Sequence, residues 1–232
     1  MKREIKAVFF DAGNTLLYLD YELIARKVCA AGVETQAEEL KVSEYDARRA
    51  VDEYLATDDY VDEMVWDIYF STMFMGVGLE SREKILATIQ NLREENEFQG
   101  LWNHAPEESH RTLETLKSQG YIIGIISNAD GRLNETIART GIDKYLDFML
   151  DSKIVGYEKP DPRIFNVALE KAGVPPEACV HVGDIVTADI KGASGVGINP
   201  VLLDPTGRHI VDCPVISDIS EIIDVVKTMN GN

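Results

Sequence analysis

In the stretch VFFDAGNTLL, residues 8–17, a single carboxylate, Asp11, directly follows a short apolar run. Together with the residues before it, IKAVFF, this run is rich in β-branched and aromatic side chains. Such a pattern is typical of a strand that is covered on both faces of its sheet. The sequence therefore predicts a buried strand that ends at Asp11, with Gly13 two residues further on.

Three later segments show the same pattern: YIIGIIS (residues 121–127), CVHVGD (179–184) and NPVLLD (199–204). Helix-like stretches alternate with them. Residues 107–119 begin with acidic side chains, 133–140 end at Gly141, and Asp161-Pro162 opens a stretch that closes at Gly173. Because strand and helix alternate, we expect an α/β fold with a doubly wound parallel sheet, helices lying on both of its faces.

Residues 18–98 interrupt this alternation. They contain no convincing strand and predict four helices, near residues 21–31, 38–56, 60–75 and 81–97. We therefore expect a core domain of residues 1–17 plus 99–232, with an inserted helical domain of residues 18–98. The insertion holds 19 acidic and 8 basic residues, a balance of −11 within the −17 of the whole chain.

Composition narrows the class of protein. The chain has 232 residues and is 45% hydrophobic, which suits one good core with a second, smaller unit. A net charge of −17 disfavours nucleic acid and anionic membrane surfaces as partners, and no stretch approaches the roughly 20 apolar residues of a membrane span. The chain has three cysteines, and their spacing matches no metal-binding motif. An odd number of cysteines suits free thiols in a reducing compartment, so we expect a cytoplasmic protein.

Polar side chains follow the predicted strands, and one lysine stands in a loop between them. Because ligands bind at the carboxyl ends of strands in an open parallel sheet, we expect these residues to converge. Carboxylates held close together repel one another unless a cation neutralises them, and a hard dication with oxygen ligands, most simply Mg²⁺, would do so. The candidate residues are Asp11, Thr15, Ser127, Asn128, Lys159, Asp184 and Asp189.

A carboxylate in such a site can also act as a nucleophile toward phosphorus and form an aspartyl-phosphate intermediate. The attack of an anion on an anionic phosphoryl group requires that charge to be balanced. A metal ion, the Lys159 ammonium, the Ser127 hydroxyl and backbone N–H groups could supply that balance.

DAGNT at residues 11–15, SN at 127–128, the lysine of KPDPRIF and GDIVTAD at 183–189 resemble, in this order, the four motifs of the haloacid dehalogenase (HAD) superfamily. Residues 18–98 resemble the helical cap that this superfamily inserts after its first motif. The resemblance implies that Asp11 is the nucleophile and that Asp11, the Gly13 carbonyl and Asp184 bind Mg²⁺. Asp189 would hold metal-bound water or orient Lys159, Ser127 and the Asn128 backbone would hold phosphoryl oxygens, and Thr15 would steady the loop.

Gly13 departs from the pattern of the phosphatases in this superfamily, most of which carry a second aspartate there. That residue protonates the leaving group and later activates water, and such general acid-base help is typically worth about 10²–10⁴-fold in rate. Glycine keeps the backbone carbonyl and therefore the metal site, but it lacks the acid. Asp130, Asp20 or a residue of the cap could donate the proton instead, and acyl or aryl phosphates would need the acid least.

Three functions remain open. The first is a phosphatase acting on a small phosphorylated molecule, as a monomer or homodimer. The second is a dehalogenase or a phosphonoacetaldehyde hydrolase, although dehalogenases typically have a serine in place of Asp184 and use a cap arginine that has no clear counterpart here. The third is a binding or regulatory protein that kept the fold and lost turnover. We interpret His181, inside a predicted strand, as a core residue rather than a ligand.

Overall fold

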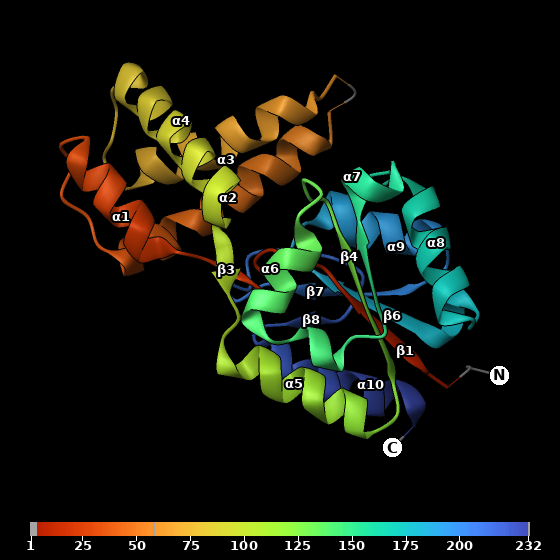
Figure 1. The fold of residues 1–232 in the computed structure, drawn as a ribbon. Coiled ribbons are helices and arrows are strands. Elements are labelled where there is room, and N and C mark those ends of the chain that lie inside the picture. The colour runs from red at the N-terminus through yellow and green to blue at the C-terminus, as the bar shows by residue number, and fades with distance from the viewer. Residues whose placement is uncertain (1–3, 58, 232) are drawn as a thin grey trace. The chain divides into compact units, whose positions relative to one another are not determined.

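A computed structural model of the protein describes residues 4–57 and 59–231. Its main sheet consists of parallel strands (Figure 1). All neighbouring strands of this sheet run parallel, and the predicted α/β fold is confirmed. The strands stand in the order β5 (Phe148–Asp151), β4 (Ile122–Ser127), β1 (Ala7–Phe10), β6 (Cys179–Gly183), β7 (Asn199–Leu203) and β8 (Val215–Ile216).

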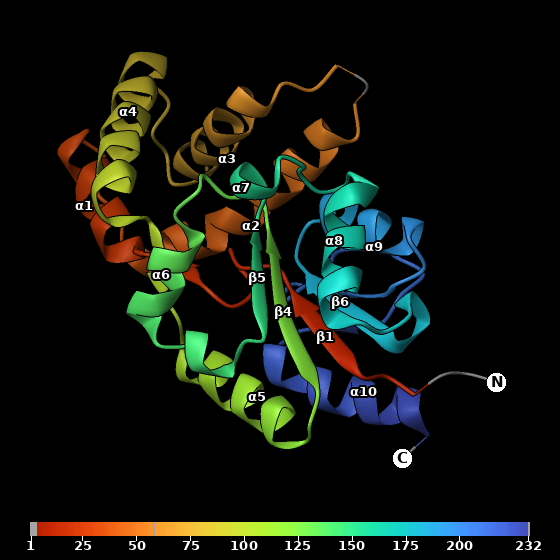
Figure 2. The ribbon, with the colours of Figure 1, turned by 45° about the vertical axis from the view of Figure 1, so that its right-hand side comes forward.

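Helices cover both faces of this sheet, because the strands present apolar side chains alternately to each side. Val8 and Phe10 of β1 belong to one hydrophobic cluster, with α5 (Glu107–Ser118), α6 (Leu133–Thr140) and α10 (Ile222–Asn230). Ala7 and Phe9 belong to the other, with α8 (Pro162–Ala172) and α9 (Gly192–Gly195). Figure 2 shows β1 and β4 between these two helical layers. Both clusters exclude water from the strands that carry the candidate residues.

Helix termini follow the signals in the sequence. Asp161 caps α8 by accepting a hydrogen bond from the Arg163 backbone N–H, Pro162 is its first residue, and Gly173 ends it in a left-handed conformation. Gly141 ends α6 in the same way. Shorter elements complete the chain: α7 (Ser152–Val155), η1 (Asp143–Tyr145), η2 (Pro176–Ala178), η4 (Ile219–Glu221) and a π-helix, η3 (Val186–Lys191).

The strand prediction was incomplete. It omitted β5, an edge strand of four residues whose first two are only half-buried, so that its apolar pattern is short. It also placed no strand within residues 18–98 and none at residues 102–104, whereas β2 (Tyr18–Leu19) pairs with β3 (Trp102–His104) in a separate two-stranded sheet. Two-residue strands carry too little periodicity to be found from sequence.

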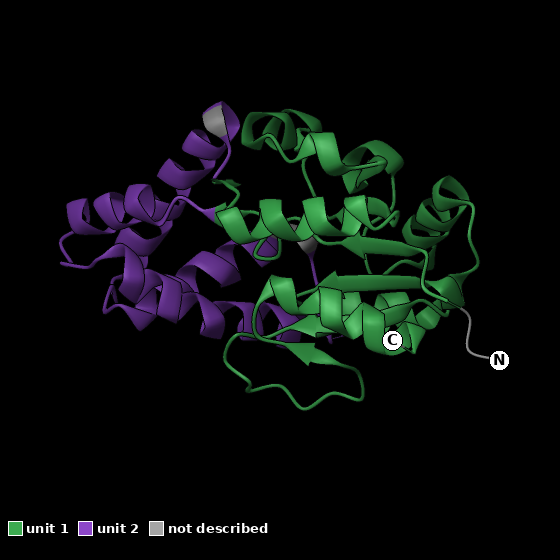
Figure 3. Ribbon diagram, turned by 90° about the horizontal axis from the view of Figure 1, so that it is seen from below, with its two compact units in different colours: residues 1–18, 102–232 green, residues 19–101 purple. Residues whose placement is uncertain are grey.

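Two compact units divide the chain, as coloured in Figure 3: residues 1–18 with 102–232, and residues 19–101. The expected insertion spans residues 18–98. The second unit contains α1 (Tyr21–Ala30), α2 (Ala37–Leu55), α3 (Asp62–Gly76) and α4 (Arg82–Gln99). None of the helices in the described residues is long and apolar enough to cross a bilayer.

A buried carboxylate joins three helices of this second unit. Glu44 on α2 is inaccessible to solvent and accepts hydrogen bonds from the hydroxyls of Tyr21 on α1, at 2.6 Å, and Tyr69 on α3. The Arg48 guanidinium, one turn further along α2, lies 2.7 Å from the same carboxylate. Because a buried charge is costly without partners, these contacts fix the register of the three helices against one another.

Candidate active site

Asp11 is the first residue after β1, at the carboxyl end of the strand. Its backbone N–H donates to the carbonyl of Val182 at 2.8 Å, which ties the residue to the neighbouring strand β6. The residue is only 9% exposed. The position of Asp11 is therefore set by the pairing of β1 with β6, in which Phe10 stands opposite Val182.

Lys159 joins Asp11 to Asp189. Its Nζ lies 2.5 Å from Oδ1 of Asp11 and 2.7 Å from Oδ1 of Asp189, and the lysine is buried. Asp189 comes from the π-helix η3, which follows β6, whereas Lys159 stands in the loop before α8. Segments distant in sequence thus meet at one edge of the sheet, as the strand-end argument predicts.

Three carboxylates gather at this end of the sheet, and two of them contact Lys159. Asp11, Asp184 and Asp189 are all buried, and each offers an oxygen such that these atoms lie within 4.8 Å of one another. The cluster holds three carboxylates and a single lysine ammonium group, so it carries surplus negative charge in a dry environment. The donor set consists of hard oxygen atoms, which fits Mg²⁺. Whether Asp11, Asp184, Asp189 and the Gly13 carbonyl do hold a metal stays a prediction.

The pKa values in this cluster diverge. Burial raises the pKa of the Asp11 carboxyl, and the charge of Asp189 adds to this effect, while Lys159 opposes it. For Asp189, burial is outweighed by Lys159 and His181, which hold its pKa well below the ordinary value. The pKa of Lys159 is raised because the two carboxylates outweigh its desolvation. These shifts favour the cationic form of Lys159 and the anionic form of Asp189.

His181 is a site residue that the sequence interpretation assigned to the core alone. It lies fully buried on β6, with its ring edge-on to Phe165, and its Nε2 is 2.9 Å from Oδ1 of Asp189. Because an ionised carboxylate can only accept, the N–H at Nε2 of His181 donates this hydrogen bond to Asp189. A polar residue within an otherwise apolar strand was the signal available in CVHVG.

Asn128 holds the backbone of Lys159 in place. Its side-chain oxygen accepts from the Lys159 N–H at 2.7 Å, and its amide donates to the Lys159 carbonyl at 2.9 Å. Ser127, the last residue of β4, is buried directly before it. The side chain of Asn128 is thus committed to positioning Lys159, which leaves its backbone for the phosphoryl contact that the resemblance implies.

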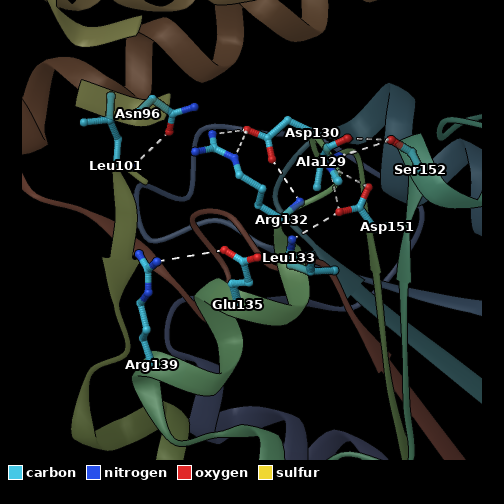
Figure 4. A network of polar contacts seen from close by, with 11 residues as sticks. Asn96, Leu101, Ala129, Asp130, Arg132, Leu133, Glu135, Arg139, Asp151 and Ser152 are labelled. Carbon is cyan, nitrogen blue, oxygen red and sulfur yellow. Dashed lines mark hydrogen bonds and ion pairs between the residues drawn. The ribbon is translucent and has the colours of Figure 1, made fainter. Parts of the chain in front are cut away.

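Asp151 and Ser152 hold the loop that follows Ser127 and Asn128 (Figure 4). Asp151, at the carboxyl end of β5, accepts from the backbone N–H groups of Gly131 and Leu133 at 3.0–3.1 Å. Ser152 Oγ pairs with both the N–H and the carbonyl of Ala129. Sequence reasoning missed both residues because it missed β5.

The loop after β1 turns back on itself. The Ala12 carbonyl accepts from the N–H groups of Leu16 at 3.0 Å and Leu17 at 2.8 Å, and Asn14 adopts a left-handed φ of 55°. Thr15 is fully buried, and its hydroxyl makes no hydrogen bond to the described residues. The loop is therefore held mainly by its backbone, and the steadying role of Thr15 remains a prediction.

Two of the suggested proton donors are engaged elsewhere. Partial burial would raise the pKa of Asp130, but the hydrogen bonds and charge of Arg132 outweigh it and lower that pKa (Figure 4). A carboxyl group held as an anion is a poor acid. Asp20 accepts from the Leu23 N–H at 2.9 Å and caps α1. Neither geometry favours donation to a leaving group.

The fold and the site together define an α/β enzyme with a carboxylate-rich site at the carboxyl ends of its strands. The chain belongs to the haloacid dehalogenase-like hydrolases, whose family model matches residues 5–197. The order of the four motifs is thus explained, and the chain is a hydrolase of HAD type.

Relatives carry different names within this family. A glyceraldehyde 3-phosphate phosphatase of Methanothermobacter thermautotrophicus is 30% identical over 96% of this chain and 100% of its own length. The bovine (Bos taurus) haloacid dehalogenase-like hydrolase domain-containing protein 3 is 28% identical over 90% of this chain and 88% of its own. A solved dehalogenase structure is 25% identical, with a TM-score of 0.67 over 97% of this chain and 98% of that one.

Proposed function

We propose that this hydrolase is a Mg²⁺-dependent phosphatase that acts on a small phosphorylated molecule through an aspartyl-phosphate intermediate. The observation that carries the proposal is the cluster of Asp11, Asp184 and Asp189, in which Asp11 and Asp189 also contact the Lys159 ammonium. The relative of M. thermautotrophicus bears a phosphatase name, which adds support.

In the proposed reaction each residue has a role that suits its position. A carboxylate oxygen of Asp11 attacks phosphorus, the bond from phosphorus to the leaving oxygen breaks, and that oxygen leaves with the bonding electrons. Water then attacks the phosphorus of phosphoaspartate, releases phosphate and restores the carboxylate. Lys159 is held next to Asp11 and balances its charge, and Ser127 stands at the adjacent strand end. A bound Mg²⁺, held by Asp11, Asp184 and Asp189, would supply electrostatic stabilisation of the phosphoryl oxygens.

The dehalogenase alternative rests on the likeness to the solved dehalogenase. Asp184 weighs against it, because a third buried carboxylate beside the nucleophile adds a charge that halide displacement does not need. The regulatory alternative rests on Gly13, and the cluster of Asp11, Lys159 and Asp189 opposes it.

Charge and cysteine chemistry support the proposed partners and compartment. The surplus of acidic residues supports a small substrate rather than nucleic acid or a membrane, and we propose that the chain acts as a monomer or homodimer. Cys29, Cys179 and Cys213 are free thiols, which supports a cytoplasmic location.

The test is a screen for phosphate release from glyceraldehyde 3-phosphate, acetyl phosphate and p-nitrophenyl phosphate, with Mg²⁺ and with a chelator. Halide release from 2-haloacids is measured alongside. We expect phosphate release that requires Mg²⁺ and falls at least about 10³-fold in Asp11→Asn, because the nucleophile is lost. Asp143→Asn, an exposed acid on η1, serves as the matched control. Activity that survives Asp11→Asn would remove Asp11 as nucleophile, and silence across the panel would favour the regulatory alternative.

A further inference from the structure

We propose that Trp102 is a specificity-determining residue beside the nucleophile. Its indole fills the space into which a side chain at position 13 would extend, and so restricts the site to leaving groups that need no proton from that position. This inference rests on the proposed phosphatase function for its kinetic part. Its structural part, the coupling of residues 13 and 102, can be tested without any activity.

The indole stands directly over Gly13. A Cβ atom built on Gly13 would lie 3.4 Å from both Cδ1 and Nε1 of Trp102 and 3.9 Å from its Cε2. A methyl group would therefore just touch the ring, and the carboxyl of an aspartate would be confined to rotamers that point away from the indole. The backbone of Gly13 lies outside the left-handed region, so its conformation does not itself demand glycine. The neighbouring ring restricts the residue type here.

Trp102 is held in this position from two sides. Its Nε1 donates a hydrogen bond to Oδ1 of Asn14 at 2.9 Å, across 88 residues of sequence. The ring also packs against the hydrophobic cluster on the face of the sheet that carries Phe10. Asn14 is itself buried, and its N–H donates to the Leu17 carbonyl at 2.6 Å. Turning the indole aside would break its hydrogen bond and its apolar contacts together.

The chemical consequence concerns the leaving group. The indole N–H is only a donor, does not ionise near neutral pH and so cannot act as a general acid, and is already bonded to Asn14. Asp130, the nearest alternative in sequence to the Ser127 motif, is paired with Arg132. The site therefore favours phosphates whose leaving group is stable as an anion, namely acyl and aryl phosphates, over esters of ordinary alcohols.

A double-mutant cycle tests the coupling. Gly13→Asp, Trp102→Ala and the double variant are compared by thermal melting and by the rate on acetyl phosphate and on glycerol phosphate. We expect Gly13→Asp alone to lower the melting temperature and to gain nothing on glycerol phosphate. In the Trp102→Ala background, the same change should cost little stability and raise the rate on glycerol phosphate by up to about 10²-fold. Trp102→Leu repeats the cycle should the alanine variant fold poorly.

Fluorescence supplies a readout that is independent of turnover. The chain has two tryptophans, so Trp66→Phe leaves Trp102 as the only tryptophan fluorophore. In that background, Gly13→Asp should shift or quench the emission, because a carboxylate is forced against the indole. Asp143→Asn, already the matched control above, should leave the emission unchanged.

Two outcomes would overturn the inference: a gain on glycerol phosphate from Gly13→Asp with Trp102 intact, or additive melting shifts in the cycle. If the wild-type chain releases no phosphate from any substrate, the proposed function fails. The melting cycle and the emission of Trp102 would still decide whether residues 13 and 102 are coupled.

Discussion

Gly183, the last residue of β6, packs against Asp189. A Cβ atom built on Gly183 would lie 2.1 Å from Cγ, 2.4 Å from Oδ2 and 2.6 Å from Cβ of Asp189. No rotation of the aspartate side chain relieves a contact that includes its own Cβ. The glycine before Asp184 is thus required by close approach, because the carboxylate of Asp189 occupies the space that a side chain would need.

We predict that Gly183→Ala displaces Asp189 and with it Lys159, which contacts Asp189 at 2.7 Å. Activity should fall at least about tenfold, and the free energy of unfolding should drop by about 1–3 kcal/mol, as for an overpacked core. The control is Gly195→Ala, where an added Cβ would meet no atom within 4 Å and alanine suits the helix α9. Urea unfolding and phosphate release measure both effects. Equal behaviour of the two variants would show that the close contact has no consequence.

The segment after β7 is organised by one carboxylate at the end of that strand. Asp204 is buried, and it accepts hydrogen bonds from the N–H and hydroxyl of Thr206 and from the N–H and Nδ1 of His209. Burial alone would raise the pKa of the Asp204 carboxyl, but these hydrogen bonds outweigh it and hold that pKa well below its ordinary value. The ionised form is therefore the one that stabilises this segment.

The lowered pKa of Asp204 predicts a pH dependence with a definite sign. The stabilisation is fully present above the ordinary aspartate pKa of about 3.9 and is lost as the pH falls through the lowered value. Asp204→Ala should reduce the free energy of unfolding by about 1–3 kcal/mol at pH 7 and pH 5, and by less at pH 3 and below. The exposed Asp212, changed to alanine, is the control. A penalty for Asp204→Ala that stays the same down to pH 2 would refute the role of its charge.

Charge governs the behaviour of the molecule as a whole. The net charge of −17 includes a cluster of three buried carboxylates, of which Asp11 and Asp189 contact the single lysine of the site. Such a cluster destabilises the native state unless a cation compensates it. A cation that binds the native state alone stabilises it by about 2.7 kcal/mol at a hundredfold excess over its Kd.

We predict that Mg²⁺ raises the melting temperature by about 5–10 °C when it saturates the site, from that free energy and the usual slope for chains of this size. KCl at equal ionic strength separates binding from general screening of the acidic surface. Asp184→Asn should raise the melting temperature without Mg²⁺, because one buried charge is removed, and should abolish most of the response to Mg²⁺. An equal rise with KCl, or an undiminished response in the variant, would argue against the metal site.

Much of the fold and of the candidate site can be predicted from the sequence, because some of the signals that determine them are local. An apolar run followed by a carboxylate, as in VFFD and VHVGD, marks a buried strand and the residue at its end. Since parallel strands share one edge, the meeting of Asp11, Lys159, Asp184 and Asp189 could be expected. Capping by Asp161 and Gly173 is local as well. The sequence did not predict the edge strand β5, because its four residues, two of them half-buried, give too weak an apolar pattern.

Contacts between side chains depended on how distant segments pack. The hydrogen bond between His181 and Asp189 requires the π-helix η3 to direct the Asp189 side chain back toward β6. Neither segment by itself has a sequence pattern that predicts this orientation. The position of the Trp102 ring over Gly13 joins segments 88 residues apart at Asn14. Register, side-chain direction and close packing arise only when the whole unit is assembled, because each contact is stabilised by neighbours that the local sequence does not contain.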